Sequence, residues 1–415
     1  MPWKACGAMD ERMRFIVDWE RLDLSFLELC ERYGISRQTG YKWVDRFGEH
    51  GAAGLKDRSR RPLHSPQATP ADMVECILEA RRRHPSWGGK KIARLCEERM
   101  PGREVPHAST VDDLLRRHGL VRMRRHRRRP GHPGRPMTKP SAPNDLWTAD
   151  FKGEFLMGDG QYCYPLTIAD QYSRYLLACK GLVSTSRKGV VPVFDRLFRE
   201  YGLPKAIRTD NGSPFASCGL ARLSKLSVWW IKLGIHPELI EPGCPSQNGS
   251  HERMHKTLKA EATRPPRANV RSQQARFDEF RQEYDFERPH ESLGQETPAA
   301  IYDFCGRPYA GTVRRPEYPG HFEVRLVSAS HSIRWKHRPI NVGSVLIGEY
   351  VGLEAVSEGV WGLYFHDYLL GHFDERTGRI EEMPTGMRRE ESSRYRVRGN
   401  RKSKGYRRGV GSGSG

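Results

Sequence analysis

Residues Ile207–Ser217 read IRTDNGSPFAS, a short apolar run that ends on an aspartate and continues as Asn-Gly. Asn and Gly both tolerate positive φ, so this dipeptide predicts a turn and places Asp210 where a strand ends. An aspartate at such a point either opens the turn with its own side chain or binds a ligand at the edge of a sheet. One carboxylate does not distinguish these, so the partners of Asp210 have to come from elsewhere in the chain.

The residues on both sides of this turn alternate between strand and helix patterns. Before it, from Asn144, come a strand that contains Asp150 (LWTADFKGEFL), two strands joined by a hairpin at 170–174, and an amphipathic helix. After it come another helix, another strand and a long helix that follows PSQNGS. A hairpin followed by alternating helices and strands predicts an α/β domain with a helix-covered sheet over 144–305.

Residues 1–50 predict three helices, the last two of which form a helix-turn-helix. A capping-box pattern (SFLE) opens the second helix, and Ser36 caps the third. In a helix-turn-helix the second helix of the pair enters the major groove of DNA. An ordinary helical bundle with a charged face is the alternative. The predicted DNA-contacting residues at the exposed start of the third helix are Arg37, Gln38 and Lys42.

A second group of three helices is predicted over 71–120, after a linker at 51–70 that is rich in Gly, Pro and Arg. Its last helix has Ser109 as its cap and Gly119 as its stop. The layout repeats that of the first group, so we interpret it as a second helix-turn-helix.

An arginine-rich arm at 121–143 separates the helical modules from the α/β domain. Such a dense run of like charge cannot pack on itself, and it suits tracking phosphates or lying in a minor groove. A solvated linker in the free protein is compatible with that role. The arginines predicted to contact DNA are Arg122, Arg124, Arg125, Arg127, Arg128 and Arg129.

The C-terminal part has two sections. Residues 306–387 hold five short strand-like segments with Gly turns, which predict a small β-barrel. Residues 388–415 are basic and poor in apolar side chains, which predicts a disordered tail.

Composition favours a nucleic-acid partner. The chain has 70 Lys and Arg against 50 Asp and Glu, a net charge of +20, and a surplus of this size favours a polyanion. The nine cysteines include no Cys-x-x-Cys pair, so we expect reduced thiols in a cytoplasmic protein. No 18-residue apolar run occurs, so we expect no membrane partner.

Three carboxylates form the candidate site: Asp150 in the first strand of the α/β domain, Asp210, and Glu252 near the start of the long helix. The gaps between them are 59 residues (151–209) and 41 residues (211–251). Taken singly, each has a structural explanation, as a strand-edge, turn-opening or exposed helical acid. Together they would repel one another unless a divalent cation neutralised them. Oxygen ligands suit Mg²⁺ or Mn²⁺, and two such ions are able to drive phosphodiester cleavage and joining.

The long helix carries a second signal. Lys256 and Lys259 follow Glu252 at i+4 and i+7, so the three share one face. Lysines that hold phosphate would then lie beside an acid that holds metal. The alternative is an exposed ion pair between Glu252 and Lys256.

Four segments carry a resemblance to a known family: WTADFKG, IADQYSRY, RTDNGSPF and PSQNGSHERMHKTLKAE. Together they resemble the integrase core of the retroviral-integrase superfamily. More closely, the chain is similar to bacterial insertion-sequence transposases that carry N-terminal helix-turn-helix modules before a DDE core. The resemblance covers residues 10–305.

This resemblance implies a ribonuclease H-like core in which Asp150, Asp210 and Glu252 are the catalytic metal ligands. It implies Mg²⁺ or Mn²⁺, two ions in each site, and a DNA-contacting role for Lys259. The residues that match motif positions around the metals are Asn211, Gly212, Gln247 and Asn248.

The chain departs from the family in its 41-residue gap, which is longer than the usual spacing and predicts an insertion near VWWIKLG. It also lacks a His/Cys zinc module of the retroviral kind. Three other acids are rivals: Asp170, to which we give a structural role at the hairpin, and Asp145 and Asp159, which precede the strand and occupy a Gly-rich turn.

The sequence therefore predicts a transposase of the bacterial nucleoid. It would bind the terminal inverted repeats of an insertion sequence, cut its 3′ ends with metal and transfer them into target DNA. Because two ends are handled together, a dimer or tetramer on DNA is expected. The alternatives are a catalytically silent DNA-binding regulator derived from such an enzyme, and a plain metal-dependent nuclease.

Overall fold

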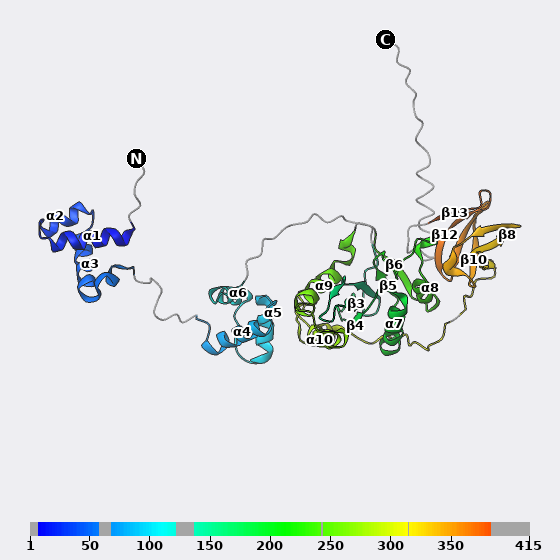
Figure 1. Ribbon diagram of the computed structural model, residues 1–415, viewed down its shortest axis with the longest axis horizontal. Coiled ribbons are helices and arrows are strands. Elements are labelled where there is room, and N and C mark those ends of the chain that lie inside the picture. Colours follow the sequence, from blue (N-terminus) through cyan, green and yellow to red (C-terminus); the bar gives the residue numbers. More distant parts are fainter. Residues whose placement is uncertain (1–6, 58–67, 122–136, 242–243, 314, 383–415) are drawn as a thin grey trace, which may run out of the picture. The chain divides into compact units, whose positions relative to one another are not determined.

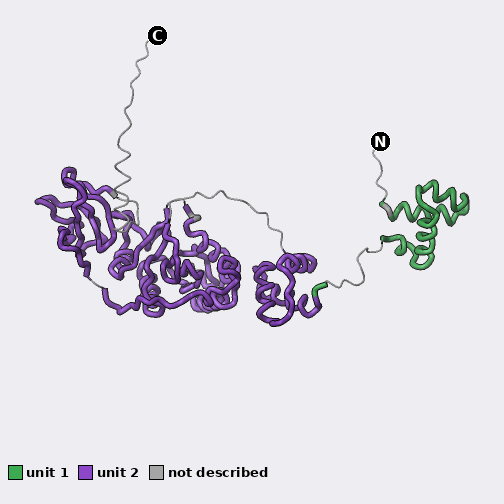
Figure 2. Tube along the Cα trace, turned by 180° about the vertical axis from the view of Figure 1, so that it is seen from behind, with its two compact units in different colours: residues 1–69 green, residues 70–415 purple. Residues whose placement is uncertain are grey.

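The computed structural model describes residues 7–57, 68–121, 137–241, 244–313 and 315–382 (Figure 1). The chain divides into two compact units, residues 1–69 and 70–415 (Figure 2). Within the described ranges, no helix combines the length and apolar character that a membrane crossing requires.

Unit 1 is a small helical module with its own core. Its elements are α1 (Ala8–Glu20), α2 (Phe26–Arg32), α3 (Arg37–His50) and the 3-10 turn η1 (Gly51–Leu55). The predicted capping box is present at the start of α2, and Ser36 caps α3 by accepting the Thr39 N–H at 3.2 Å. A Cβ at Gly40 would lie 2.7 Å from the sulfur of Cys30, so glycine permits the close approach of α3 to α2.

The linker predicted from Gly51 begins later than expected. Leu55 is fully buried and completes a core with Phe15 and Trp43, and Arg12 donates to the Leu55 carbonyl at 2.7 Å. An apolar side chain that closes the core therefore keeps residues 51–55 in the helical module.

Unit 2 opens with a second three-helix module: α4 (Ala71–Arg83), α5 (Gly89–Arg99) and α6 (Ala108–Arg117). Ser109 was predicted as the cap of α6 but lies inside it. The N-cap is His107, whose ring accepts the Ser109 N–H at 3.4 Å. The carboxylate of Asp112 accepts the Gly89 N–H at 2.9 Å and so joins α6 to the start of α5.

The centre of unit 2 is a mixed sheet with the order β2-β3-β1-β5-β6, in which β4 also pairs with β3. β1 is antiparallel to β3 and parallel to β5, which is parallel to β6. The strands are β1 (Leu146–Phe151), β2 (Phe155–Leu156), β3 (Tyr162–Asp170), β4 (Ala178–Leu182), β5 (Ala206–Thr209) and β6 (His236–Leu239).

Helices cover both faces of this sheet (Figure 1). On one face α7 (Arg187–Tyr201) and α8 (Lys225–Lys232) pack on Trp147 and Ala149 of β1. On the other, α9 (Gly249–Glu261) and α10 (Val270–Gln282) pack on β3 and β4. Successive strand residues face opposite sides, so Thr148 and Asp150 face α9. The predicted helix-covered α/β sheet, of ribonuclease H-like type, is confirmed, and the helices lie on both of its faces.

Short elements connect and follow these helices. They are η2 (Leu220–Arg222), η3 (Pro245–Asn248), the π-helical turn η4 (Glu283–Glu287), η5 (Glu291–Leu293), α11 (Pro298–Ile301) and η6 (Ser344–Leu346).

The C-terminal region is a five-stranded antiparallel sheet, in the order β13-β12-β11-β10-β7, with a separate hairpin β8-β9. Its strands are β7 (Glu323–Leu326), β8 (Ser332–Trp335), β9 (Arg338–Asn341), β10 (Tyr350–Ser357), β11 (Val360–Phe365), β12 (Tyr368–Asp374) and β13 (Arg379–Glu382). IRWKHRPI, predicted as one strand, forms the hairpin because Lys336 and His337 both have positive φ.

The predicted closure into a barrel is not found, since the edge strands β7 and β13 do not pair with each other in the described part of the chain. Instead, the apolar side of the sheet is covered by the hairpin and by the α/β core. Leu223, before α8, and Val228 and Ile231 within it share one buried cluster with Trp335 and Phe373.

Candidate active site

Parallel pairing places Asp150 beside Asp210. Trp147 lies opposite Ile207 in the register of β1 and β5, and the last pair joins Ala149 to Thr209. Asp150 is the next residue of β1, and Asp210 is the residue that directly follows β5. Adjacent strands lie about 4.8 Å apart, and equivalent residues of paired strands point to the same side, so both carboxylates face α9.

Helix α9 brings Glu252 to the same place, because His251 fixes its first turn to the sheet. One ring nitrogen of His251 lies 2.9 Å from the Thr148 hydroxyl and the other 2.7 Å from the Thr167 hydroxyl. Glu252 follows it at the exposed margin of the helix. Burial, followed by the charges of Asp210 and Glu252, raises the pKa of Asp150 to about 7. The three acids therefore act as one cluster.

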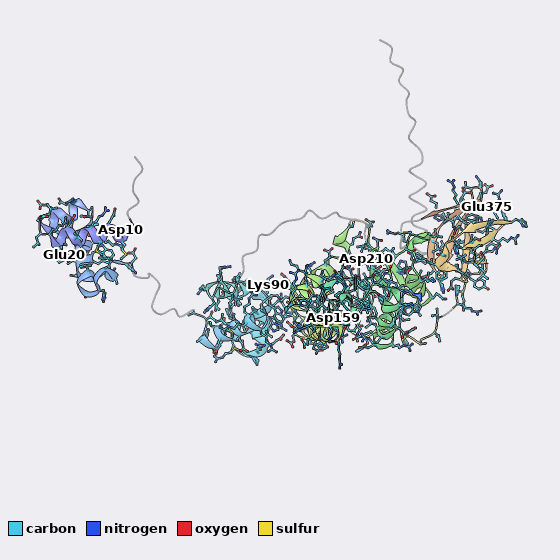
Figure 3. All side chains as sticks on the ribbon, in the orientation of Figure 1. Asp10, Glu20, Lys90, Asp159, Asp210 and Glu375 are labelled. Carbon is cyan, nitrogen blue, oxygen red and sulfur yellow. The ribbon has the colours of Figure 1, made fainter. Side chains whose placement is uncertain are left out.

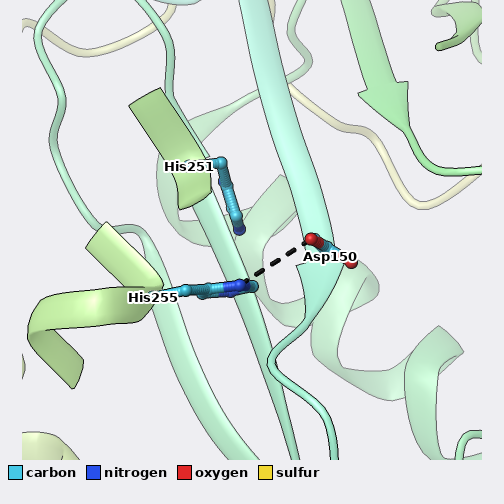
Figure 4. A group of neighbouring side chains, drawn as sticks. All are labelled: Asp150, His251 and His255. Atoms are coloured by element: carbon cyan, nitrogen blue, oxygen red, sulfur yellow. Dashed lines mark ion pairs between the residues drawn. The ribbon is translucent and has the colours of Figure 1, made fainter. Parts of the chain in front are cut away.

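His255 and His251 lie beside Asp150 (Figure 4). The Nδ1 of His255 lies 3.7 Å from a carboxylate oxygen of Asp150, and its Nε2 lies 2.6 Å from the Thr167 hydroxyl. Burial lowers the pKa of His255 and brings that of His251 to about 3. Both rings are therefore neutral, and the contact with Asp150 is not an ion pair.

The basic residues of α9 have two kinds of surroundings. Burial and then the charge of Lys259 lower the pKa of Lys152, and Asp150 opposes both. Lys259 therefore lies near Lys152, on the side of the acids. Lys256 lines a cavity with Arg253. That Glu252, Lys256 and Lys259 share one face of α9 stays a prediction, and Glu252 makes no ion pair with Lys256 among the described contacts.

The loop after β5 is shaped around Asp210. The Gly212 N–H bonds to the Asp210 carboxylate, and a Cβ at Gly212 would lie 2.9 Å from a carboxylate oxygen. Asn211 donates to the Ile240 carbonyl at 2.7 Å and so joins this loop to the end of β6.

The loop before α9 holds the remaining two predicted residues. The side chain of Gln247 accepts the Glu241 N–H at 2.8 Å. Asn248 is 3% exposed and is the N-cap residue of α9, but its side chain accepts no capping hydrogen bond from the first turn of that helix.

A buried ion pair that the sequence did not reveal positions both loops. Arg208 and Glu238 are register partners on β5 and β6, and Arg208 Nε donates to Glu238 at 3.0 Å. Arg208 also donates to the Gln247 carbonyl at 3.2 Å and to the Thr138 carbonyl at 2.7 Å. It thereby connects the strand of Asp210 to the loop that leads to Glu252.

The three rival acids have other roles. Asp170 is fully buried and accepts the backbone N–H groups of Ser173 and Asn144, so it caps the hairpin as predicted. Asp145 forms an ion pair with Lys205 at 2.7 Å. Asp159 lies in the turn before β3, away from Asp210 (Figure 3), and accepts the Gln161 N–H.

The predicted DNA-contacting residues divide between described and undescribed segments. Arg37, Gln38 and Lys42 are exposed along α3. The arginines of the arm, at 122–129, lie outside the described residues.

The acid cluster fits a divalent cation. Asp210 Oδ1 is buried without a hydrogen-bond partner among the described residues, which is costly unless something binds it. Burial raises the pKa values of Asp150 and Asp210, and the charges of Asp210 and Glu252 add to the effect on Asp150; a cation would favour the charged form of both acids. Carboxylate oxygens are the ligands that Mg²⁺ and Mn²⁺ prefer.

Comparisons with known proteins agree with this reading of the chain. Two models of an integrase core domain match residues 140–245 and 233–298. A helix-turn-helix domain model matches residues 11–62, and a homeodomain-like domain model matches residues 39–115.

Relatives include two proteins of bacterial insertion elements. An uncharacterized 31.7 kDa protein of insertion element IS407 from Burkholderia multivorans is 29% identical over 285 residues, which are 68% of this chain and 91% of that protein. An uncharacterized 39.2 kDa protein of insertion element IS476 from Xanthomonas euvesicatoria is 29% identical over 61% of this chain and 72% of its own length.

Among solved structures, the catalytic core domain of HTLV-2 integrase in complex with magnesium aligns over 40% of this chain and all of its own, at 14% identity and a TM-score of 0.31.

Proposed function

We propose that the chain, which matches integrase core models and is similar to proteins of bacterial insertion elements, is the transposase of an insertion sequence. It binds the terminal inverted repeats of that element, cuts their 3′ ends and joins these ends to target DNA in the bacterial nucleoid. It acts as a dimer or tetramer on DNA, because two ends have to be processed together.

The observation that carries this proposal is the convergence of three acids from separate elements. Asp150 is the last residue but one of β1, Asp210 directly follows the adjacent parallel strand β5, and the charge of Glu252 on α9 acts on Asp150. A regulator that only bound DNA would gain nothing from a cluster in which buried acids repel one another. All three acids are present in a site whose histidines and loops hold them in place.

Asp150, Asp210 and Glu252 are proposed to hold Mg²⁺ or Mn²⁺, two ions in each site. A divalent cation bound there supplies Lewis-acid activation of a water or a 3′-hydroxyl and stabilises the leaving oxygen. Lys152 and Lys259 lie beside these acids and are proposed to bind the phosphates on either side of the scissile bond.

Recognition of the element ends is assigned to the helical modules. Arg37, Gln38 and Lys42 are exposed at the start of α3, where a recognition helix contacts base edges. The arginine-rich arm adds contacts to phosphates, which makes binding dependent on salt.

The first experiment incubates the full chain with a labelled duplex that carries the ends of its element, with Mg²⁺ or with EDTA. Metal-dependent nicking at the 3′ ends, followed by joining to a second duplex, is the expected result. Nicking without joining would indicate a nuclease. Sequence-specific binding without cleavage in Mg²⁺ and in Mn²⁺ would indicate a regulator.

Asp210→Asn is the matched variant for this experiment. It keeps the shape of the loop but removes a charge from the cluster, so we expect cleavage to be abolished and duplex affinity to stay within about twofold, since binding depends on the basic modules. Cleavage at the wild-type rate would show that Asp210 only opens a turn.

A further inference from the structure

A cavity of about 410 Å³ lies beside α9, where the second helical module meets the α/β core. Its wall combines α5, α9, the hairpin after β3 and the segment 284–292. It is strongly basic, and the cationic side chains that line it are Lys91, Arg174, Arg253, Lys256 and Arg288.

The acids around this cavity are already paired. On the rim, residues of the module bind acids of the core: His84 lies 2.8 Å from Glu283, and Arg94 lies 3.3 Å from Glu296. Lys90, labelled in Figure 3, pairs with Glu291. These contacts join the module to the core and leave the cavity with a surplus of positive charge.

Inside the cavity only Arg288 has a close carboxylate partner among the described residues. It is 7% exposed and lies 3.1 Å from Glu261. Nη1 of Arg174 is buried without a hydrogen-bond partner among the described residues. A buried donor without a partner costs free energy, so this wall is built for an acceptor that the described protein residues do not supply.

The like charges converge closely. Burial, followed by the charges of Lys91, Arg288 and Arg174, lowers the pKa of His290 to about 3. Burial and then Arg288 lower the pKa of Lys91 to about 7. An anion placed among these groups would relieve their mutual repulsion.

We propose that this cavity binds a backbone phosphate of the DNA substrate and that this phosphate links the second helical module to α9. The proposal rests on the proposed function, since it takes DNA as the substrate. Arginine forks and lysines are the side chains that bind phosphate oxygens best.

The position on α9 explains how one strand could reach both sites. Lys256 lines the cavity and stands one turn from Glu252, whose charge acts on Asp150. A helix with its side chains is about 10–12 Å wide, and successive phosphates of one strand advance about 3.4 Å along the duplex axis. A strand that passes Lys256 would therefore place a phosphate in the cavity within about three nucleotides of the bond at the acids.

Hydrogen exchange of the full chain tests the location. The protein is measured in EDTA, with a duplex of arbitrary sequence, with inorganic phosphate alone, and with neither. We expect the duplex to slow exchange in residues 84–92 and 284–292, and inorganic phosphate to leave them unchanged. No protection by the duplex would overturn the proposal. Equal protection by inorganic phosphate would assign the cavity to a free anion and would also overturn it.

A charge-matched pair of double variants tests the contribution to affinity. Lys91→Gln with Arg253→Gln removes two charges from the cavity, and Lys188→Gln with Arg271→Gln removes two exposed charges outside it. Losing one phosphate contact lowers the slope of log affinity against log salt by about 0.9. We expect that loss in the cavity variant and no comparable change in the control.

Equal slopes for the two variants would contradict the proposal. Both measurements are made without metal and without cleavage. A failure here therefore leaves the proposed transposase chemistry untouched, and a failure of cleavage leaves this phosphate site open to the same test.

Discussion

Asp150 is subject to two opposing influences. Burial, together with the charges of Asp210 and Glu252, favours its protonated form and raises its pKa to about 7. A divalent cation among the three acids would favour the carboxylate instead. The stability of the protein should therefore report on the state of this one side chain.

Asp150→Asn is expected to stabilise the metal-free protein in a pH-dependent way. Between the unfolded pKa of 3.8 and the folded value of about 7, the folded state holds more protons than the unfolded state, so stability falls as pH rises through this range. The variant lacks that loss. It should match the wild type below about pH 4 and exceed it by about 4 kcal/mol above pH 8.

Unfolding midpoints of both proteins in EDTA, measured across this pH range, check the prediction. Adding saturating Mg²⁺ is the control, since it should stabilise the wild type and leave the variant unchanged. A variant that is less stable than the wild type at pH 8 in EDTA would show that the charged Asp150 carboxylate does not destabilise the metal-free protein.

The three acids could be chosen as candidates from the sequence because each lies near a recognisable boundary, a strand end or the first turn of a helix. His251 and His255 were missed, although they stand one turn apart on α9. Their role depends on hydroxyls of β1 and β3 that are distant in sequence. The periodicity of a sequence predicts which residues share a helix face, but it does not predict which side chains of other elements that face will contact.

At the scale of elements, the Arg208–Glu238 pair joins two strands and two loops. Arg208→Met is expected to lower stability by about 3–5 kcal/mol, because it leaves a buried carboxylate without its partner. The double variant with Glu238→Leu should recover most of that loss. It still lacks the donor to the Gln247 carbonyl, so cleavage should remain low.

Denaturant unfolding and the 3′-nicking assay, applied to both variants, separate these effects. Wild-type cleavage by the double variant would mean that the pair only stabilises the sheet and does not position the loop before α9.

Helix and strand patterns predicted the order of elements in the α/β core, since each has its own period and caps. They did not predict what covers the C-terminal sheet. The described residues between β5 and α8 include η2, and Ala221 and Leu223 of this segment pack against that sheet. The long gap between Asp210 and Glu252 thus contains a docking surface, which becomes recognisable only when both partners are folded.

At the scale of the whole molecule, the parts differ in how far they depend on one another. The C-terminal sheet shares a buried cluster with α8, so removing it would expose Val228 and Ile231 of the α/β core. Residues 1–69 instead close a core of their own around Phe15 and Trp43.

A chain of residues 70–415 is therefore expected to unfold at the temperature of the full chain and to keep its stabilisation by Mg²⁺. It loses α3 and with it the proposed base contacts of Arg37, Gln38 and Lys42. Affinity for a duplex with the element ends should fall by at least about tenfold, since one good base contact is worth about 1–3 kcal/mol. Affinity for a duplex of arbitrary sequence should fall less. Thermal unfolding and anisotropy titrations with the two duplexes check both parts. An equal loss for the two duplexes would mean that residues 1–69 contribute only charge, and sequence recognition would then have to be sought in α4–α6.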